Sequence, residues 1–281
     1  MDIMKISEIN IYPVKSLKGI GLTEAQVEKR GLRHDRRWML TDKADVFFTQ
    51  REFPRMATIE VTVGDDLVKF TANGFRELIV PHVPGTQDRR LVTIWQNVCE
   101  GDVYEKEVND WFSEVLETDC QLVYMPDATE RHVNERFDTG NDIVSFADGY
   151  PLMLLGENSL AELNSRLPEQ LPMNRFRPNL VVTGSEAFAE GTWKRIRIGD
   201  VTFRVVKPCV RCVMTTVDQA TGEFDGKEPL KTLASYRMAR DVLPSAYEAM
   251  GLSANGILFG ENLIPDSTGS IALDDPVVVI Q

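Results

Sequence analysis

The first third of the chain consists of short apolar segments separated by turn residues, and this pattern narrows the choice of fold more than any other feature. Apolar and polar residues alternate within several segments, as expected for strands with one buried face. Glycines and an Asn73-Gly74 pair separate them. The pattern predicts an antiparallel, barrel-like β domain. The segments are 5–14, 23–30, 37–42, 57–63, 67–72 and 76–81.

Three helical segments are expected later in the chain. A stripe of apolar residues predicts a helix over 103–117, because its members recur on one helical face. Ser159 with Glu162 three residues later has the spacing of a capping box and predicts the start of a second helix. The third helical segment is 230–242. The stripe in the first helix is formed by Tyr104, Val108, Trp111, Phe112 and Val115.

Strand-like segments dominate again from residue 178 onwards. Together with the helical segments, they predict a mixed, β-rich α+β fold with two domains. The first is a β-barrel-like domain over residues 1–118. The second covers residues 119–281 and combines strands with a few helices, and its β-barrel form is implied by the family resemblance of the motifs below.

Composition restricts the classes of function. The formal net charge of −12 disfavours general nucleic-acid binding, because the average surface repels polyanions. The four cysteines do not make a disulfide framework in 281 residues. The N-terminal residues lack the basic and then apolar order of a signal peptide, and no apolar run approaches the length of about 18 residues needed to span a membrane. We therefore expect a cytoplasmic protein without a membrane partner.

The segment 207-KPCVRCVMTTVDQATGE-223 holds the most unusual chemistry, a Cys-x-x-Cys pair. A structural zinc site needs four ligands, and neither the isolated Cys99 and Cys120 nor the dispersed histidines supply the other two. A redox-active pair usually lies at the N-terminus of a helix. Here the flanking segments 201–206 and 213–217 are β-like, which places the pair on a connection between strands.

A single reactive thiolate is the remaining chemical interpretation of this pair. Arg211 immediately precedes Cys212, and a neighbouring cation favours the ionised form of a thiol. Free cysteines also pack as small buried apolar residues, so the spacing alone leaves both interpretations open. Cations that could hold an anion occur elsewhere at Lys15, Arg36 and Arg177, but a lone cation is usually a solvated surface charge.

Ten short strings distributed along the chain resemble one known family. They are YPVKS (12–16), DR followed by W (35–38), SFADGYP (145–151), NSRL (164–167), FRPNLVV (176–182), IGD (198–200), KPCVRC with TTVD (207–218), EPLKTL (228–233), SYR (235–237) and FGEN (259–262). In this order they resemble MOSC proteins with an N-terminal MOSC β-barrel domain. This family includes the bacterial YcbX-type proteins and the mitochondrial amidoxime-reducing component.

The resemblance implies a molybdenum cofactor, Mo-molybdopterin, bound between the two domains. In the family motif the second cysteine ligates the metal, which corresponds to Cys212, and a soft thiolate suits this role. Arg211 is then expected to keep this sulfur ionised. The loop with Asp148, Gly149 and Tyr150 is expected near the metal, with Asp148 as a candidate proton relay or a turn residue. The cofactor-binding residues implied by the motifs are Lys15, Ser16, Arg36, Arg177 and Asn179, with Asn262 as a weaker candidate.

The same resemblance implies a reductase of N-hydroxylated small molecules such as amidoximes and hydroxylaminopurines. The chain lacks the cysteine spacing of a plant-type 2Fe-2S site, so we expect electrons from a separate ferredoxin, flavoprotein or haem protein. An acidic surface favours a donor with a basic patch. The alternative is a non-catalytic protein that carries the cofactor, or carries sulfur as a persulfide on Cys212.

Overall fold

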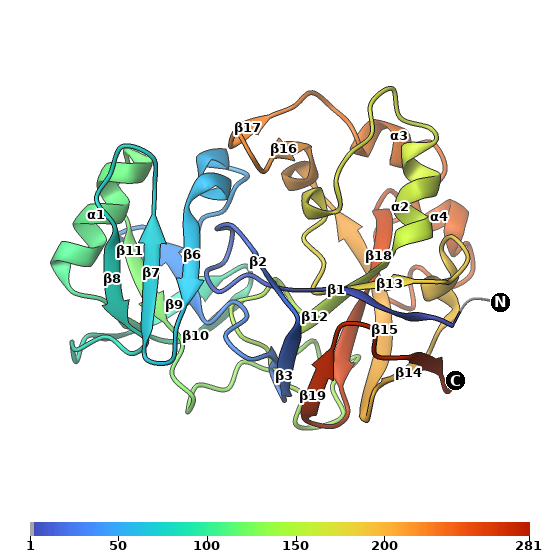
Figure 1. The fold of residues 1–281 in the computed structure, drawn as a ribbon, viewed down its shortest axis with the longest axis horizontal. Coiled ribbons are helices and arrows are strands. Elements are labelled where there is room, and N and C mark those ends of the chain that lie inside the picture. The colour runs from blue at the N-terminus through green and yellow to red at the C-terminus, as the bar shows by residue number, and fades with distance from the viewer. Residues whose placement is uncertain (1–2) are drawn as a thin grey trace.

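The computed structural model describes residues 3–281, which form two parts that lie side by side (Figure 1). The part built mainly from residues 38–124 contains two antiparallel sheets and one helix. Its first sheet has the order β5-β11-β10-β9 and its second the order β6-β7-β8. These elements are β5 (Trp38–Thr41), β6 (Glu60–Val63), β7 (Leu67–Thr71), β8 (Leu78–Pro81), β9 (Arg89–Ile94), β10 (Asn97–Val103), α1 (Lys106–Leu116) and β11 (Gln121–Tyr124).

The core of this part forms between the sheets and α1. Trp38, Phe70 and Phe112 are completely buried there, and they come from β5, β7 and α1. The expected apolar stripe is confirmed for the members on α1, since Val108, Phe112 and Val115 are buried and Trp111 packs partly against the same core, whereas Tyr104 is buried but lies before the helix. The helix begins at Lys106 and not at 103, because Val103 pairs with Val123 as the last residue of β10.

An eight-stranded sheet forms the other part, with the order β2-β1-β13-β12-β18-β15-β14-β20. Its strands are β1 (Lys5–Ile11), β2 (Ile20–Leu22), β12 (Leu152–Gly156), β13 (Leu180–Thr183), β14 (Arg195–Ile198), β15 (Val201–Arg211), β18 (Ile257–Pro265) and β20 (Val277–Val279). A three-stranded sheet, β19-β3-β4, adds β3 (Glu24–Glu28), β4 (Gly31–Leu32) and β19 (Gly269–Ala272).

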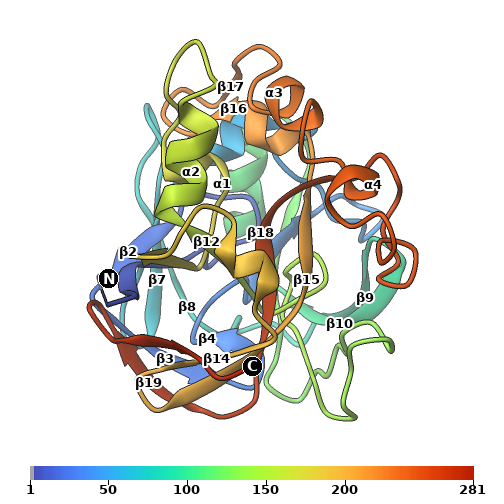
Figure 2. The ribbon, with the colours of Figure 1, turned by 90° about the vertical axis from the view of Figure 1, so that its right-hand side faces the viewer.

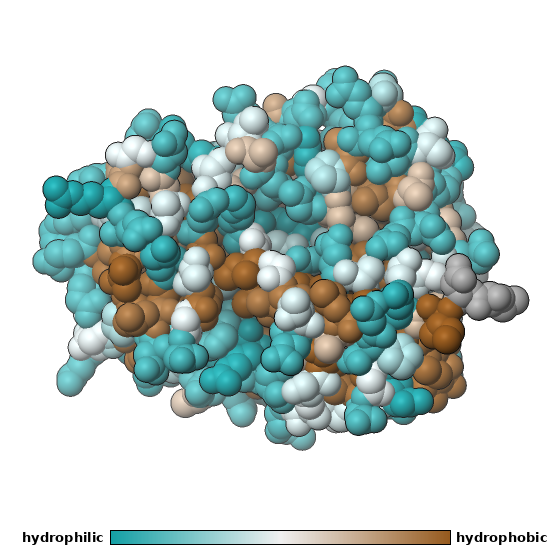
Figure 3. Space-filling view, in the orientation of Figure 1, coloured by the Kyte–Doolittle hydropathy of each residue, from teal (hydrophilic) through white to brown (hydrophobic). Residues whose placement is uncertain are grey.

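Short helices cover one side of the large sheet (Figure 2), and a β hairpin lies between the two parts and packs on residues 54–58 (Figure 1). Leu160, Leu163 and Leu233 of the helices pack with Leu155 and Phe259 of the sheet into one apolar cluster. On the space-filling surface, hydrophilic side chains surround the hollow between the two parts (Figure 3). The covering helices are α2 (Glu157–Asn164), α3 (Leu230–Ala234) and α4 (Ala239–Val242), and the hairpin consists of β16 (Val217–Asp218) and β17 (Glu223–Phe224).

The chain crosses between the two parts more than once. β1 is antiparallel to β13, with Lys5 opposite Thr183, and β3 is antiparallel to β19. β11 follows α1 but pairs with β5 and β10. These pairings confirm the expected mixed, β-rich α+β class, and they join strands from the two ends of the sequence into shared sheets. No helix within residues 3–281 is long and apolar enough to span a membrane.

Three local expectations were wrong, two of them because a tertiary contact outweighs a local pattern: Glu190 accepts from the Ser159 hydroxyl, and Met238, inside the expected third helix, pairs with Ile257 of β18. Gly156 caps α2, while Ser159 lies inside the helix, fully buried, and donates a hydrogen bond to Glu190 at 2.7 Å. The single helix expected over 230–242 is divided into α3 and α4. Residues Val213–Thr216 form a 3₁₀ turn and not a strand, so Cys209 lies within β15 and Cys212 directly follows it.

The turn between β16 and β17 packs on the other part of the molecule and makes a testable contact. Gly222 has a φ of +69°, and a Cβ atom there would lie 2.8 Å from Cα of Arg55. Gly226 has a similar φ of +66° but nothing within 4 Å of that position. We expect Gly226→Ala to lower the free energy of unfolding by about 1 kcal/mol through backbone strain alone. Gly222→Ala should cost about 2 to 4 kcal/mol, because steric overlap adds to this strain.

Urea denaturation of the two glycine variants measures the difference. Gly226→Ala serves as the matched control, because both substitutions add one methyl group at a left-handed residue. Equal midpoints for the two variants would show that the turn does not press against the other part of the molecule.

Candidate functional site

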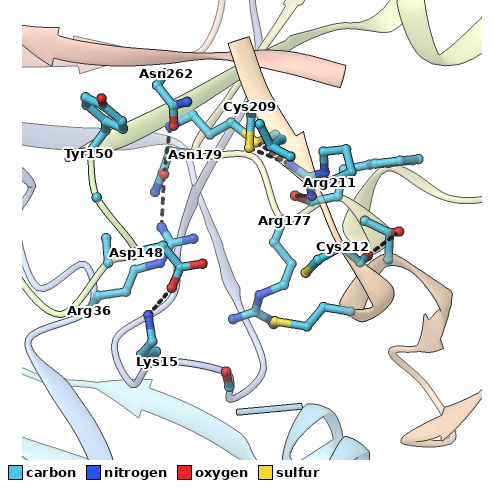
Figure 4. A pocket seen from close by; sticks show the side chains of 18 of the residues that line it. Lys15, Arg36, Asp148, Tyr150, Arg177, Asn179, Cys209, Arg211, Cys212 and Asn262 are labelled. Carbon is cyan, nitrogen blue, oxygen red and sulfur yellow. Dashed lines mark hydrogen bonds and ion pairs between the residues drawn. The ribbon is translucent and has the colours of Figure 1, made fainter. Parts of the chain in front are cut away.

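A pocket between the two parts collects residues from distant segments of the chain (Figure 4). All eleven residues expected at a functional site line this pocket. They come from the connection after β1, the turn before β5, the loop before β12, the segment before β13, the end of β15, and β18. The eleven residues are Lys15, Ser16, Arg36, Asp148, Gly149, Tyr150, Arg177, Asn179, Arg211, Cys212 and Asn262.

Three of the lining residues have left-handed backbone conformations that side chains other than glycine rarely adopt. Their φ angles are 69° for Ser16, 48° for Arg36 and 55° for Arg177. Such residues typically cost about 1 to 3 kcal/mol each and persist where surrounding contacts impose them. The Arg36 amide, for example, donates to the Tyr12 carbonyl at 2.9 Å. Concentration of this strain around one pocket is typical of a functional site.

Two of the arginines are anchored around Tyr12. The guanidinium of Arg36 lies 4.2 Å from the centre of the Tyr12 ring, and that of Arg177 lies 4.1 Å from it. Arg36 also donates to Asp35 at 2.6 Å and to Asn179 at 2.9 Å. Asn179 in turn donates to the carbonyl of Asn10. These contacts hold two cations and one amide in fixed orientations at the pocket wall.

The pocket carries a strong excess of positive charge in an otherwise acidic protein. Among its lining residues, Asp148 is the only carboxylate, against six cationic side chains. Asp35 pairs with Arg36, and Asp218 and Asp225 pair with Arg175, so among the described residues Arg177 and Arg211 are the lining cations without a carboxylate partner. Burial lowers the pKa of Arg177 to about 10, and nearby Arg36 adds to this shift while Tyr12 opposes it. A buried cation that is not paired with a carboxylate is costly. The cations are Lys15, Arg36, Arg51, Arg175, Arg177 and Arg211.

Several polar atoms of the pocket residues are buried without a hydrogen-bond partner. They include Ser16 Oγ, Nε and Nη1 of Arg175, Nη2 of Arg177 and Nε of Arg211. Unsatisfied buried groups are rare in folded proteins, so their concentration at one pocket requires an explanation. Four of these five atoms are guanidinium nitrogens, which are hydrogen-bond donors only. The donor set therefore fits an anionic ligand with several acceptor oxygens, such as a phosphate-bearing cofactor.

The two cysteines lie in different surroundings. Cys209, within β15, accepts a hydrogen bond from Arg211 Nη1 at 3.0 Å, and burial raises the pKa of its thiol although Arg211 opposes the shift. Arg211 also donates to the Phe176 carbonyl at 2.7 Å. Cys212 is half-buried and accepts a hydrogen bond from Arg51 Nη2 at 3.2 Å.

The expectation that the Arg211 side chain stabilises the Cys212 thiolate is therefore wrong, because this side chain contacts Cys209 instead. Successive residues of a strand point to opposite faces, so Arg211 shares a face with Cys209, two residues before it. The cation that reaches Cys212 is Arg51, which comes from the other part of the molecule. Figure 4 shows Arg211 directed toward Cys209, with Cys212 lying separately.

Lys15 and Asp148 form an ion pair at the opposite side of the site. The Lys15 ammonium is buried and donates to Asp148 Oδ1 and to the Phe146 carbonyl, the latter at 2.9 Å. Burial lowers the pKa of Lys15 to about 8, although the charge of Asp148 opposes the shift. Partial enclosure raises the pKa of Asp148, but the charge and hydrogen bond of Lys15 and the charge of Arg51 outweigh it. Their net effect holds this pKa well below its usual range.

The remaining expected residues line the pocket with weaker contacts. Asn262 donates to the Lys207 carbonyl at 3.1 Å, which leaves its amide oxygen available. The Tyr150 ring packs edge-on against Phe137. Burial raises the pKa of the Tyr150 hydroxyl to about 12, although the charge of Arg136 opposes this shift. Gly149 has open space where a side chain would begin.

Sequence reasoning missed two arginines of the pocket. Arg51 lies in a loop without a recognisable motif, so nothing in its neighbourhood distinguishes it from a surface charge. Arg175 stands two residues before Arg177 and could have been suspected from that spacing. It is almost completely buried, and its Nη2 donates to Asp218 at 3.0 Å and Asp225 at 2.7 Å.

Two family models match the chain, with boundaries that differ from those of the two structural parts, because β1 to β4 belong to the sheets of the second part. Residues 3–119 match the MOSC N-terminal beta barrel domain, and residues 141–278 match the MOSC domain. Mitochondrial amidoxime reducing component 2 of Bos taurus is 35% identical, with the alignment covering 97% of this chain and 82% of that protein. Mitochondrial amidoxime-reducing component 1 of Homo sapiens is 33% identical over 98% of this chain and 82% of its own. The chain therefore belongs to the family of two-domain MOSC proteins that includes the mitochondrial amidoxime-reducing components.

Proposed function

We propose that this protein is a molybdenum-cofactor-dependent reductase of N-hydroxylated compounds, with the Cys212 thiolate as the protein ligand of the metal. The observation that carries the proposal is the pocket itself, in which buried, unsatisfied guanidinium nitrogens lie around the Cys212 thiol, and this thiol accepts a hydrogen bond from Arg51. The names of the relatives supply the substrate class, because they are amidoxime-reducing components. Membership in the family supports the same cofactor, because the MOSC domain is associated with molybdenum.

Different residues of the pocket would hold different parts of such a cofactor. Arg175 and Arg177 offer free donors to its phosphate, and planar guanidinium groups suit phosphate because they can donate two parallel hydrogen bonds. Ser16 offers a free hydroxyl. Cys212 offers a soft sulfur ligand, which Arg51 holds through its hydrogen bond. When bound, the molybdenum centre would supply two-electron chemistry to the substrate.

Lys15 and Asp148 provide a source of protons for the reaction. Reduction of R–NHOH to R–NH₂ and water consumes two electrons and two protons. Asp148 is ionised at neutral pH and cannot itself be the stored acid, whereas the buried ammonium of Lys15 has a pKa of about 8 and can release a proton. Lys15 therefore delivers the proton toward the leaving hydroxyl, and Asp148 orients it.

The electrons come from a separate donor protein in this proposal. The net charge of −12 favours a donor that presents a basic patch toward the molecule. A ferredoxin, a flavoprotein or a haem protein could each meet this requirement. We also propose a cytoplasmic location, on the composition of the chain alone.

The function is tested with protein purified from a host that makes the cofactor. Reduced methyl viologen supplies electrons, and conversion of benzamidoxime to benzamidine is followed by chromatography. We expect turnover that depends on both the electron donor and the molybdenum content. Molybdenum-loaded protein that forms no benzamidine would exclude the reductase activity for this substrate.

The second candidate is a carrier of sulfur on Cys212. The half-buried thiol favours it, because an accessible sulfur can hold and pass on a persulfide. Mass spectrometry of protein isolated without reductants distinguishes the two. A stable additional sulfur on Cys212, with no molybdenum and no benzamidoxime turnover, would favour the carrier over the reductase.

A further inference from the structure

The tip of the β9–β10 hairpin places an aromatic residue beside the pocket. Ile94 pairs with Asn97, so Trp95 and Gln96 form the turn between the two strands. The indole N–H of Trp95 donates to Asp148 Oδ1 at 3.1 Å, and the Arg51 guanidinium lies 4.6 Å from the centre of the ring. Both partners line the pocket. Trp95 is thus in direct contact with the side chains around Cys212, although no motif marks it.

The backbone of Trp95 is strained. Its φ is +54°, a left-handed conformation at a turn position that usually carries glycine, asparagine or aspartate. A bulky residue there is a real outlier, because left-handed geometry brings its Cβ atom close to the following carbonyl oxygen. Local folding preference therefore does not account for a tryptophan at this point. Strained residues that persist beside a pocket point to a role in function.

Several contacts hold the ring in one orientation while much of it stays exposed. Phe47 packs edge-on with a centroid distance of 4.9 Å, and Arg51 and Asp148 provide the contacts described above. Arg131 fixes the hairpin to the pocket loop, since it donates both to Asn97 and to the Asp148 carbonyl. Nevertheless 46% of Trp95 is exposed. A ring that is already ordered loses little conformational entropy when a ligand packs on it.

The groups around the Trp95 ring indicate the chemical class of ligand that would bind there. Asp148 Oδ1 already accepts from Lys15 and Trp95, whereas Oδ2 has only the distant charge of Arg51, at 3.7 Å. This oxygen is free to accept a hydrogen bond from an N–H group of a ligand. The excess of cations in the pocket disfavours a positively charged ligand. A neutral, flat molecule with an N–H group beside a conjugated ring fits the exposed indole ring, the free Oδ2 atom of Asp148 and the excess of cations.

We propose that Trp95 is a stacking platform at the mouth of the pocket that selects flat, conjugated N-hydroxylated substrates over aliphatic ones. This inference rests on the proposed function and specifies its substrate class. Aromatic stacking of a ring on a side chain is commonly worth about 1 to 3 kcal/mol, which corresponds to a change of about fivefold to 150-fold in binding. An aliphatic substrate of the same chemical type gains little from the platform.

Two substrates that differ in conjugation test the platform. Benzamidoxime carries a ring and acetamidoxime carries a methyl group on the same reacting unit. With reduced methyl viologen as donor, we expect Trp95→Ala to raise KM for benzamidoxime about tenfold. We expect kcat for both substrates and KM for acetamidoxime to stay within about twofold. Trp95→Phe should lie between, because it keeps a ring and loses the indole N–H.

A purely structural role predicts a different result. If Trp95 only supported Arg51, its loss would impair both substrates equally or lower kcat alone, and either outcome would overturn the platform. Leu91→Ala is the matched control, because Leu91 is 65% exposed on the same hairpin and should leave all constants unchanged. Molybdenum content and thermal unfolding verify that each variant is loaded and folded. An artificial donor removes effects on the docking of a partner protein.

Binding measured by calorimetry separates this inference from the proposed function. If the wild type binds benzamidoxime and Trp95→Ala binds it about tenfold more weakly, the platform is supported even without turnover, and absent turnover counts against the reductase alone. If the wild type reduces benzamidoxime and the variant does so with unchanged KM, the platform is overturned and the reductase stands. No detectable binding to the wild type also overturns the platform.

Discussion

Cys212→Ser is expected to lose most of its molybdenum and its benzamidoxime reduction. A serine hydroxyl is a harder and far less acidic ligand than a thiol, so it replaces a soft thiolate poorly at this metal. Loss of a residue that only hydrogen-bonds to a metal ligand typically lowers metal affinity or activity about 10- to 100-fold. Loss of the ligand itself should lower them by more than this range. Metal content by mass spectrometry and turnover with reduced methyl viologen measure the two effects.

Cys209→Ser provides the matched control for the cysteine variant. Cys209 is two residues from Arg211 on the same face of β15 and accepts its hydrogen bond, which a serine oxygen can also accept. We expect molybdenum and activity within about twofold of the wild type. Equal metal in both variants and the wild type would refute Cys212 as the ligand, and so would a loss confined to Cys209→Ser.

The activity should decline on the alkaline side as Lys15 loses its proton. Because burial lowers the pKa of Lys15 to about 8, the ammonium is present below this pH and disappears above it. We expect kcat to fall about tenfold per pH unit above this point, as for a required acid. Asp148 opposes the lowering of the Lys15 pKa, so Asp148→Asn should move the decline to lower pH. A pH profile of kcat for both proteins measures the shift.

Lys15→Arg tests whether the proton or only the charge is required. Arginine keeps the positive charge next to Asp148 but remains protonated at any working pH. We expect molybdenum to be retained and kcat to fall about 100-fold, the usual scale of general acid catalysis. Full activity in Lys15→Arg, or a wild-type profile that stays flat to pH 9.5, would show that Lys15 does not supply the proton.

Much of the pocket could be predicted from short motifs, but the contacts within it could not. Lys15, Arg36 and Arg177 belong to strings that identify the family, and the structure places them together. Arg51 belongs to no such string, and its distance from Cys212 depends on how the two parts dock. The partner of Arg211 follows from side-chain alternation along β15, but only once the strand is known to continue through residue 211.

For the fold as well, local features could be predicted from the sequence and long-range contacts could not. Alternation correctly indicated local strands such as β7, since Val68 and Phe70 are buried and their neighbours are less so. The pairing of β1 with β13 has no local signal, because it joins segments far apart in sequence. Ser159 had the residue types of a helix cap, but the buried Glu190 offered its hydroxyl a stronger partner. Local patterns predict elements, whereas their long-range pairing depends on the whole chain.

The pairing of β1 with β13 has a consequence for the order of events during synthesis. Lys15 and Ser16 lie four and five residues after the end of β1, so they take up their positions only after this strand has docked. Its partner residues, Leu180–Thr183, leave the ribosome much later, and β19, which pairs with β3, later still. Such non-local pairings form slowly. The anion-binding wall is therefore completed only after residues 180–183 have been synthesised, and cofactor loading must follow this step.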